Sequence, residues 1–292
     1  DEVCRAAAAR GVRVTGAEIV GLMPKRVLLD AGRHYLEMQQ RSVGIPEDDI
    51  IQIAIKSMSL DQLKPFYPKE KVIEMLLEAD DDTQKLVDLS VKAFTEETSR
   101  ESPAPGGGTI AACMGAMGAA LGTMVANLSA HKRGWDERWE EFSRWAEKGQ
   151  ALQSRLLRLI DDDTAAFNEI MAAFGMPKSN DEEKALRSAA IQTATLHAAQ
   201  VPLETMKTAF EAFALCKAMA ENGNPNSISD AGVGALAIRA AVRGACMNVK
   251  INASSLKDRS LAEPLIAEAD RIAEEADREE AAITSFINAR LV

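Results

Sequence analysis

The spacing of apolar side chains changes near residue 85 and divides the chain into two parts. From Leu86 onward apolar residues recur at helical spacing, without an alternating, strand-like segment. We expect helices over about 86–98, 110–130, 136–174, 181–199, 201–221, 228–253 and 258–290, separated by SPAPGGGT, MPKSND and NGNPNSISD. This pattern predicts an all-α helical bundle over residues 86–292 and a mainly α protein.

The first 80 residues carry a mixed pattern. Residues 12–21 alternate and are rich in Val and Ile, which predicts a strand. Pro24 and the turn GIPEDD each precede a segment with helical spacing, and KEKVIEMLLE predicts a short third helix. We therefore expect a partial α/β unit over residues 1–80, followed by a linker at 81–85 in the acidic stretch ADDDTQ.

Residues 110–128 contain no charged side chain over about the length of a membrane span. Because they are mainly Ala, Gly and Met, with few bulky apolar residues, we expect a buried bundle helix and no membrane span. Gly115, Gly118, Gly122 and Ala126 lie along one face of this helix, where another backbone can approach closely. Packing inside the bundle, packing inside a dimer and access for a ligand would each account for this stripe.

Composition and charge narrow the function classes. The chain has 292 residues, roughly two domains' worth, with 27% charged and 47% hydrophobic residues, which is typical of globular proteins. Its 34 basic and 44 acidic residues give a net charge of −10, which disfavours nucleic-acid binding. The four cysteines include no CxxC pair and the three histidines no HExxH motif, so no metal site is expected. Scattered cysteines favour a cytoplasmic location, and a start at Asp1 within a helical pattern suggests the C-terminal part of a longer chain.

Two segments contain the strongest candidates for chemistry. Gly106, Gly107 and Gly108 precede a helix, whose unpaired N–H groups can hold an anion, although a flexible turn explains them equally. Asp161, Asp162 and Asp163 follow one another in a helix at steps of about 100°, so at least one should turn inward. An inward carboxylate would have a raised pKa suited to proton transfer, whereas the alternative is a solvated acidic patch.

Further polar positions allow both structural and functional interpretations. Asn248 and Asn252 share one helix face, which indicates either a hydrogen-bond network or a polar ligand. Asp230 lies at a helix start, where an N-cap role is the alternative. Lys132 and Arg133 end the apolar helix, where they would complement the helix dipole or hold an anionic substrate tail. No Ser or Cys lies in a GxSxG motif, so covalent catalysis is disfavoured.

The stretch SPAPGGGTIAACMGAMGAALGTMVANL resembles formimidoyltetrahydrofolate cyclodeaminases. The resemblance continues through LIDDDTAAFNEIM, AAQVPLE, NPNSISDAGVGAL and CMNVKIN, and it covers the chain from Leu86 to the C-terminus. Methenyltetrahydrofolate cyclohydrolases are similar over the same region. The end of a glutamate formimidoyltransferase domain is similar to two earlier stretches, VTGAEIVGLMPKRVLLDAGRHYL and LDQLKPFYPKEKVIEMLL. The resemblance implies that a partial formimidoyltransferase domain precedes the cyclodeaminase region. Transferase activity is therefore not expected.

The resemblance implies cyclisation of 5-formimidoyltetrahydrofolate to 5,10-methenyltetrahydrofolate with release of ammonia, an ammonia-lyase reaction of histidine degradation and one-carbon metabolism. It implies that Asp163 is the catalytic acid and base, that Asp161 is the first acid of the same pattern and that Asp162 is exposed. The other residues that it places at or near the substrate are Gly106, Gly107 and Gly108 at the pterin, and Asp230, Asn248 and Asn252. Lys132 and Arg133 match a basic pair of the family, and our hypothesis is that they attract a folate polyglutamate tail.

The same resemblance implies the partners. We expect a folate substrate, including polyglutamylated forms, no metal and no other cofactor, and a homo-oligomer that is at least a dimer, pairing through the small-residue helices. The alternatives are a methenyltetrahydrofolate cyclohydrolase, in which water attacks the methenyl carbon, and a non-catalytic folate-binding or oligomerisation module.

Overall fold

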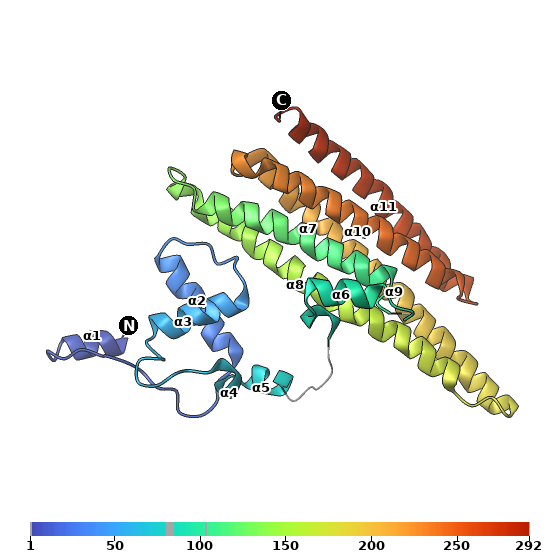
Figure 1. The fold of residues 1–292 in the computed structure, drawn as a ribbon, viewed down its shortest axis with the longest axis horizontal. Coiled ribbons are helices and arrows are strands. Elements are labelled where there is room, and N and C mark those ends of the chain that lie inside the picture. The colour runs from blue at the N-terminus through green and yellow to red at the C-terminus, as the bar shows by residue number, and fades with distance from the viewer. Residues whose placement is uncertain (1, 80–84, 103, 292) are drawn as a thin grey trace.

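The computed structural model describes residues 2–79, 85–102 and 104–291. Long helices dominate it from Gly107 onward and run side by side as a bundle (Figure 1): α7 (Gly107–Ala130), α8 (Trp139–Gly175), α9 (Asp181–Asn222), α10 (Ile228–Ser254) and α11 (Arg259–Asn288). Helix α7 packs against α8, α9 and α10, and α11 packs against α9 and α10. The prediction of a mainly α protein with a helical bundle is confirmed.

The small residues of α7 allow this close packing. A Cβ added at Gly118 would lie 2.8 Å from the carbonyl oxygen of Gly234 on α10, and one added at Gly122 would lie 2.8 Å from Leu215 on α9. These faces are filled by helices of the same chain, so the small-residue stripe serves packing inside the bundle, and pairing of two chains through the small-residue helices stays a prediction. Helix α7 is long and apolar enough to cross a membrane, but 61% of its apolar window is buried, as in a bundle core.

Two helix boundaries differ from the prediction. The segments expected as 181–199 and 201–221 form the single helix α9, which continues through Pro202. Residues 86–98 form a 3-10 turn, η1 (Leu86–Asp88), and a separate helix, α6 (Val91–Thr98). Ser90 is the N-cap of α6, because its hydroxyl accepts the backbone N–H of Ala93.

The N-terminal part contains α1 (Glu2–Ala8), α2 (Lys25–Met38), α3 (Glu47–Ser57), α4 (Pro68–Lys71) and α5 (Ile73–Ala79). Its core is a separate cluster that includes Leu28, Leu36 and Ile50. The predicted strand at 12–21 is wrong: these residues are irregular, and within the described ranges the only β-type pairing is an isolated bridge between Met23 and Val72. A strand requires a continuous hydrogen-bond ladder with a neighbour. In the described part of the chain residues 12–21 have no such ladder, although the N–H of Ala17 donates to the carbonyl oxygen of Ser59 (3.1 Å). The α/β unit is therefore helical and irregular as described, and most of the predicted 81–85 linker lies outside the described residues.

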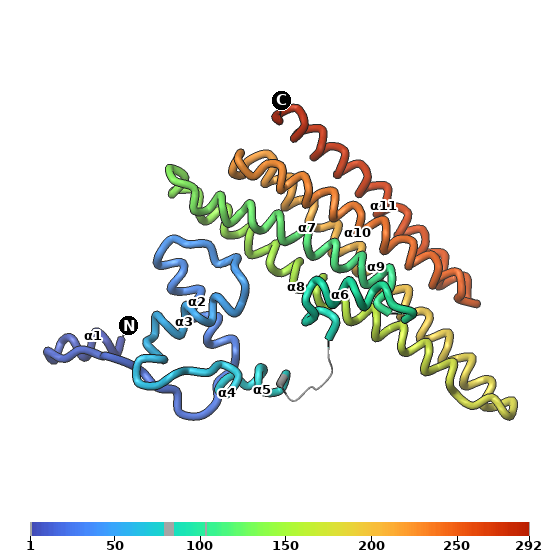
Figure 2. Tube along the Cα trace, in the orientation of Figure 1, coloured from blue at the N-terminus to red at the C-terminus, as the bar shows by residue number. Residues whose placement is uncertain are grey.

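A loop after α2 joins this part to the bundle, as the chain path in Figure 2 shows. Asn127 on α7 donates from Nδ2 to the carbonyl oxygen of Gly44 (2.8 Å), and the N–H of Val43 donates to Ser143 Oγ on α8 (3.0 Å). A Cβ on Gly44 would lie 2.2 Å from the carbonyl carbon of Ala146, so the loop lies directly on the α8 backbone. This contact fixes the N-terminal part at the end of the bundle where α7 finishes.

Candidate active site

A small polar cavity of about 190 Å³ lies where α7 begins. Its lining combines residues from the loop before α7, from the first turn of α7 and from α8, α9 and α10. The residues are Ala104, Gly106, Gly107, Gly108, Asp163, Thr164, Phe167, Ile170, Ala198, Asn248 and Asn252. The cavity thus brings together six of the residues that the sequence singled out: the three glycines, Asp163 and the two asparagines.

Helical geometry separates the three consecutive aspartates. Asp163 turns into the cavity, Asp162 is exposed as predicted, and Asp161 points toward η1, where its Oδ1 accepts the N–H of Leu86 (2.7 Å). The step of about 100° per residue therefore gives each carboxylate a different surrounding. Asp161 is close to the cavity in sequence, but its carboxylate holds η1 against α8. Its position two residues before Asp163 did not predict this contact.

The surroundings of Asp163 adjust its proton affinity in two directions. Burial is the larger effect and raises the pKa of its carboxyl group, while hydrogen bonds from the hydroxyl and the backbone N–H of Thr109 partly offset that rise. The hydroxyl of Thr109 donates to Asp163 Oδ2 at 2.8 Å, and its oxygen accepts the N–H of Gly106 at 3.2 Å. A carboxyl group with a raised pKa exchanges protons closer to neutral pH than an exposed aspartate does.

The glycines are needed for space. A Cβ on Gly108 would lie 2.2 Å from Asp163 Oδ1, and one on Gly107 would lie 3.2 Å from Asn248 Nδ2. The carboxylate of Asp163 therefore packs directly on the first turn of α7. A larger residue at position 108 would occupy the space of this carboxylate.

Asn252 occupies its position because of a proline on the neighbouring helix. Pro202 has no N–H, so the carbonyl oxygen of Ala198, four residues earlier in α9, lacks its usual helical donor. Asn252 supplies the missing donor: its Nδ2 lies 2.6 Å from that oxygen. Asn248 in turn donates from Nδ2 to Gly244 of its own helix at 3.0 Å. Both amide groups are thus fixed at the cavity wall, with their Oδ1 atoms left to accept hydrogen bonds from a ligand.

Sequence reasoning missed several lining residues. Thr164 Oγ1 is buried and has no hydrogen-bond partner among the described residues, so a bound ligand is the available partner. Thr109, which bonds Asp163, could have been found, because a polar side chain three residues after an N-cap often accepts the N-cap N–H, as Thr109 Oγ1 does from Gly106. Thr164 could not, since its orientation depends on how α8 packs against α7.

Lys132, Arg133 and Asp230 lie at the opposite end of the bundle. Lys132 follows the end of α7, and the helix rise of about 1.5 Å per residue puts it about 39 Å from Gly106. The Nζ of Lys132 stacks over Trp135 at 4.0 Å. Asp230 is in the first turn of α10, and it does not cap that helix, whose N-cap is Ser227. The structure therefore does not bring these three residues to the Asp163 cavity within one chain.

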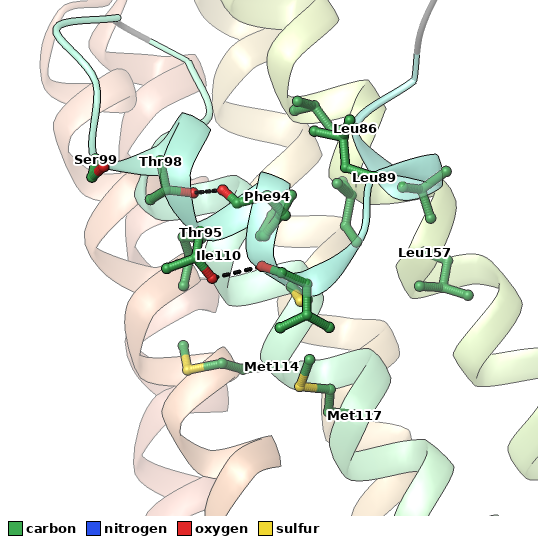
Figure 3. A pocket seen from close by; sticks show the side chains of 14 residues that line it. Leu86, Leu89, Phe94, Thr95, Thr98, Ser99, Ile110, Met114, Met117 and Leu157 are labelled. Atoms are coloured by element: carbon green, nitrogen blue, oxygen red, sulfur yellow. Dashed lines mark hydrogen bonds between the residues drawn. The ribbon is translucent and has the colours of Figure 1, made fainter.

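A larger cavity, of about 580 Å³, lies beneath α6 and is almost wholly apolar. Figure 3 shows its side chains: Leu86 and Phe94 come from η1 and α6, Ile110 and Met114 from α7, and Leu157 from α8. Cys113 also lines it, and burial raises the pKa of that thiol, so it stays protonated at neutral pH. This cavity can hold an apolar group, whereas Asp163 lines the smaller, polar one.

Comparisons with known proteins identify the family. The sequence model of the family "Formiminotransferase-cyclodeaminase" matches residues 90–271, and that of the "Formiminotransferase domain" matches residues 1–78. The formimidoyltransferase-cyclodeaminase of Rattus norvegicus is 33% identical over 290 residues, which cover 99% of this chain and 53% of that protein. The chain therefore spans about half the length of such relatives.

Two shorter proteins match over nearly their whole length. A methenyltetrahydrofolate cyclohydrolase of Methylorubrum extorquens is 42% identical over 187 residues, covering 64% of this chain and 90% of that protein. The crystal structure of a formiminotetrahydrofolate cyclodeaminase from Thermotoga maritima superposes with a TM-score of 0.63 at 26% identity, covering 71% of this chain and 100% of that one. The chain belongs to the formiminotransferase-cyclodeaminase family.

Proposed function

We propose that this chain is a formimidoyltetrahydrofolate cyclodeaminase, which closes 5-formimidoyltetrahydrofolate to 5,10-methenyltetrahydrofolate and releases ammonia. The observation that carries the proposal is Asp163, a half-buried carboxylate with a raised pKa at the wall of a polar cavity. The family membership and the similarity to a cyclodeaminase of known structure support it.

The reaction needs two proton transfers and a carboxylate that can carry both. N10 of the folate attacks the formimidoyl carbon, so the N10–C bond forms and N10 must lose its proton. In the amidinium form of the substrate the formimidoyl nitrogen already carries two hydrogens, so it must gain one further proton to leave as ammonia when its C–N bond breaks, and the methenyl product keeps the positive charge. Asp163 takes the first proton and delivers the second, which leaves its own protonation unchanged over the cycle.

The other lining residues suit the binding of a pterin. The amide oxygens of Asn248 and Asn252 can accept hydrogen bonds from ring N–H groups, and Thr164 supplies a buried hydroxyl. We propose that no metal or redox cofactor takes part, because both bond changes are acid–base steps.

Methenyltetrahydrofolate cyclohydrolase remains the second candidate, since the relative from Methylorubrum extorquens has that name and is 42% identical. There, water would attack the methenyl carbon and Asp163 would accept its proton. The match of residues 1–78 to a formiminotransferase domain favours the cyclodeaminase, because a transferase would supply the formimidoyl substrate. A non-catalytic folate-binding module is the third, and it would bind folate without turnover.

We also propose that the chain acts as a homo-oligomer, at least a dimer. Large apolar side chains remain exposed on α7 and α10, among them Met117 (53% exposed), Leu236 (50%) and Met247 (68%). A second copy that covered these side chains would remove them from water, and the small-residue stripe would stay within each bundle.

The Asp163→Asn variant tests the proposed reaction. It keeps the shape of the side chain and removes its ability to carry a proton, so we expect cyclisation to fall by at least about 100-fold, the usual contribution of a general acid–base group. The assay follows methenyl absorbance and ammonia release together, with tetrahydrofolate binding measured separately. Asp162→Asn is the matched control, because Asp162 is exposed and one residue away. Turnover at the rate of the unmodified chain in Asp163→Asn would refute the assignment.

A further inference from the structure

A histidine joins the loop after α2 to the bundle, in addition to Asn127 and Ser143. The backbone N–H of Ser42 donates to Nε2 of His131 at 3.2 Å. His131 is the C-cap of α7 and lies at the helix end on which the loop docks. The hydroxyl of Ser42 accepts the N–H of Gly44 at 3.2 Å, which ties this bond to the part of the loop that packs on α8.

The hydrogen bond from Ser42 requires a neutral imidazole. Nε2 of His131 accepts the N–H only while it carries no proton, and the ring proton is then on Nδ1. An imidazolium has an N–H at both nitrogens and accepts no hydrogen bond. Ser42 is 1% exposed, so water cannot replace the lost partner while the loop stays docked, and the N–H would be buried without an acceptor.

The surroundings of His131 also favour the neutral ring. Burial is the larger effect and lowers the pKa of its imidazole, and the positive charge of Arg41 on the docked loop lowers that pKa further. Gln150 and Gln153, which line one cavity with His131 from α8, are uncharged. No carboxylate of the described chain is among the groups that shift the pKa of His131, although Glu147 lies on α8 next to the docked loop.

Protonation of His131 therefore opposes docking. Because docking lowers the pKa of its imidazole below the ordinary value of 6.5, the undocked chain binds the proton more tightly than the docked chain does. Docking is then strongest above pH 6.5 and weakens as the pH falls below that value, by up to about tenfold in the docking equilibrium for each pH unit. Lys132 and Arg133, the next residues in the chain, are basic and offer the imidazolium no opposite charge.

We infer that His131 is a pH-sensitive latch between the two parts of the chain: the neutral ring holds the loop after α2 on the bundle, and the imidazolium releases it. The regions that match the formiminotransferase domain and the cyclodeaminase family, 1–78 and 90–271, are thereby held together at neutral pH and separate in mild acid. The Asp163 cavity lies at the other end of α7, so the latch is independent of the proposed reaction.

The test is the rate at which a protease of broad specificity cuts the loop at residues 42–44, which are buried while the loop is docked. The His131→Gln variant keeps an acceptor, its Oε1, but cannot take up a proton. Both chains are digested side by side at each pH, so that the pH dependence of the protease cancels in the ratio of the two rates, and the cut is located by mass. We expect the ratio of the unmodified chain to His131→Gln to rise about tenfold between about pH 8 and about pH 5.5.

Two further variants make the test specific. His131→Arg carries a positive charge at every pH and has no acceptor, so its loop should be cut rapidly even at about pH 8. His197→Gln makes the same change as His131→Gln at a half-exposed histidine on α9, and its rate relative to the unmodified chain should not vary with pH.

Four results would overturn the inference. They are a ratio of the unmodified chain to His131→Gln that does not vary with pH, the same variation in His197→Gln, slow cutting of His131→Arg at about pH 8, and cutting within the bundle helices as fast as in the loop at about pH 5.5. The last result would mean that acid unfolds the whole chain and does not release the loop alone. None of these measurements requires turnover of a folate, so the latch and the proposed reaction can fail separately.

Discussion

Replacing Gly108 by alanine should displace the Asp163 carboxylate, the proposed acid and base, without weakening the helix. The added Cβ would lie 2.2 Å from Asp163 Oδ1, 2.7 Å from Cγ and 2.8 Å from Oδ2, whereas ordinary van der Waals contact begins at 3.4 Å. Asp163 must therefore move by about 1.2 Å, the difference between 2.2 and 3.4 Å. That shift also lengthens the hydrogen bond from Thr109, which is 2.8 Å in the unmodified chain.

The size of the effect follows from that shift. A misplacement of about 1 Å in a reacting group costs about 100-fold in rate, so we expect kcat/KM to fall by about that factor. Alanine is preferred to glycine inside helices by about 0.5–1 kcal/mol, and the free energy of unfolding should therefore change little, because the gain offsets part of the strain. A large loss of activity in a protein of nearly normal stability is the expected combination.

The assay is the rise of methenyl absorbance on adding 5-formimidoyltetrahydrofolate, with urea unfolding of the same preparations. Gly107→Ala is the matched control, since it changes the same helix turn but meets Asn248 Nδ2 at 3.2 Å, which needs only a few tenths of an ångström of adjustment. We expect it to lose less than about tenfold, by the same relation between displacement and rate. If Gly108→Ala kept activity within a factor of two of the unmodified chain while folded, the carboxylate would not act from the position described.

Two further changes test the electrostatics and the docking contact. Thr109→Val removes a hydrogen bond that lowers the pKa of Asp163, so that pKa should rise further. The acid limb of kcat/KM against pH should then move to higher pH, whereas Thr109→Ser should keep the profile of the unmodified chain. An unmoved limb in Thr109→Val would contradict the reasoning. Gly44→Ala would place a Cβ 2.2 Å from the α8 backbone and release the loop after α2. Two of the hydrogen bonds that dock this loop, with Asn127 and Ser143, would be lost, at a cost of about 1–3 kcal/mol in docking free energy. Proteolysis between the two parts should then accelerate, while kcat/KM stays unchanged. Gly175→Ala, where the added atom meets open space, is its control, and equal proteolysis of the two variants would refute the contact.

Much of the site could be predicted because its residues follow local rules. The 100° step between helical residues required that Asp161, Asp162 and Asp163 differ in surroundings, and the structure gives each a different one. The spacing of Asn248 and Asn252 placed both amides on one helix face, which proved to be the cavity face.

The rest depended on tertiary structure. The continuation of α9 through Pro202 requires an outside donor for the Ala198 carbonyl oxygen, and that donor, Asn252, comes from another helix. The large distance between Lys132 and Asp163, in contrast, could have been predicted, because the length of the apolar helix separates its two ends. The prediction of a strand at 12–21 was wrong because an alternating pattern shows only that a segment is suited to a sheet. A strand also needs a neighbouring strand to pair with, and the pattern does not supply one.

Two segments that precede α7 are attached to α8 at separate points, which explains why docking of the N-terminal part and the proposed catalysis should respond to different changes. Ser143 holds the loop at Val43, and Asp161 holds the start of η1 at Leu86. Eighteen residues separate these two anchors, so they lie about 27 Å apart along the helix. Only the second is within one turn of Asp163, and it also fixes a wall of the apolar cavity. Loss of the anchor at Ser143 should therefore lower the free energy of unfolding and leave kcat/KM unchanged, because Leu86 stays bonded to Asp161 beside the Asp163 carboxylate.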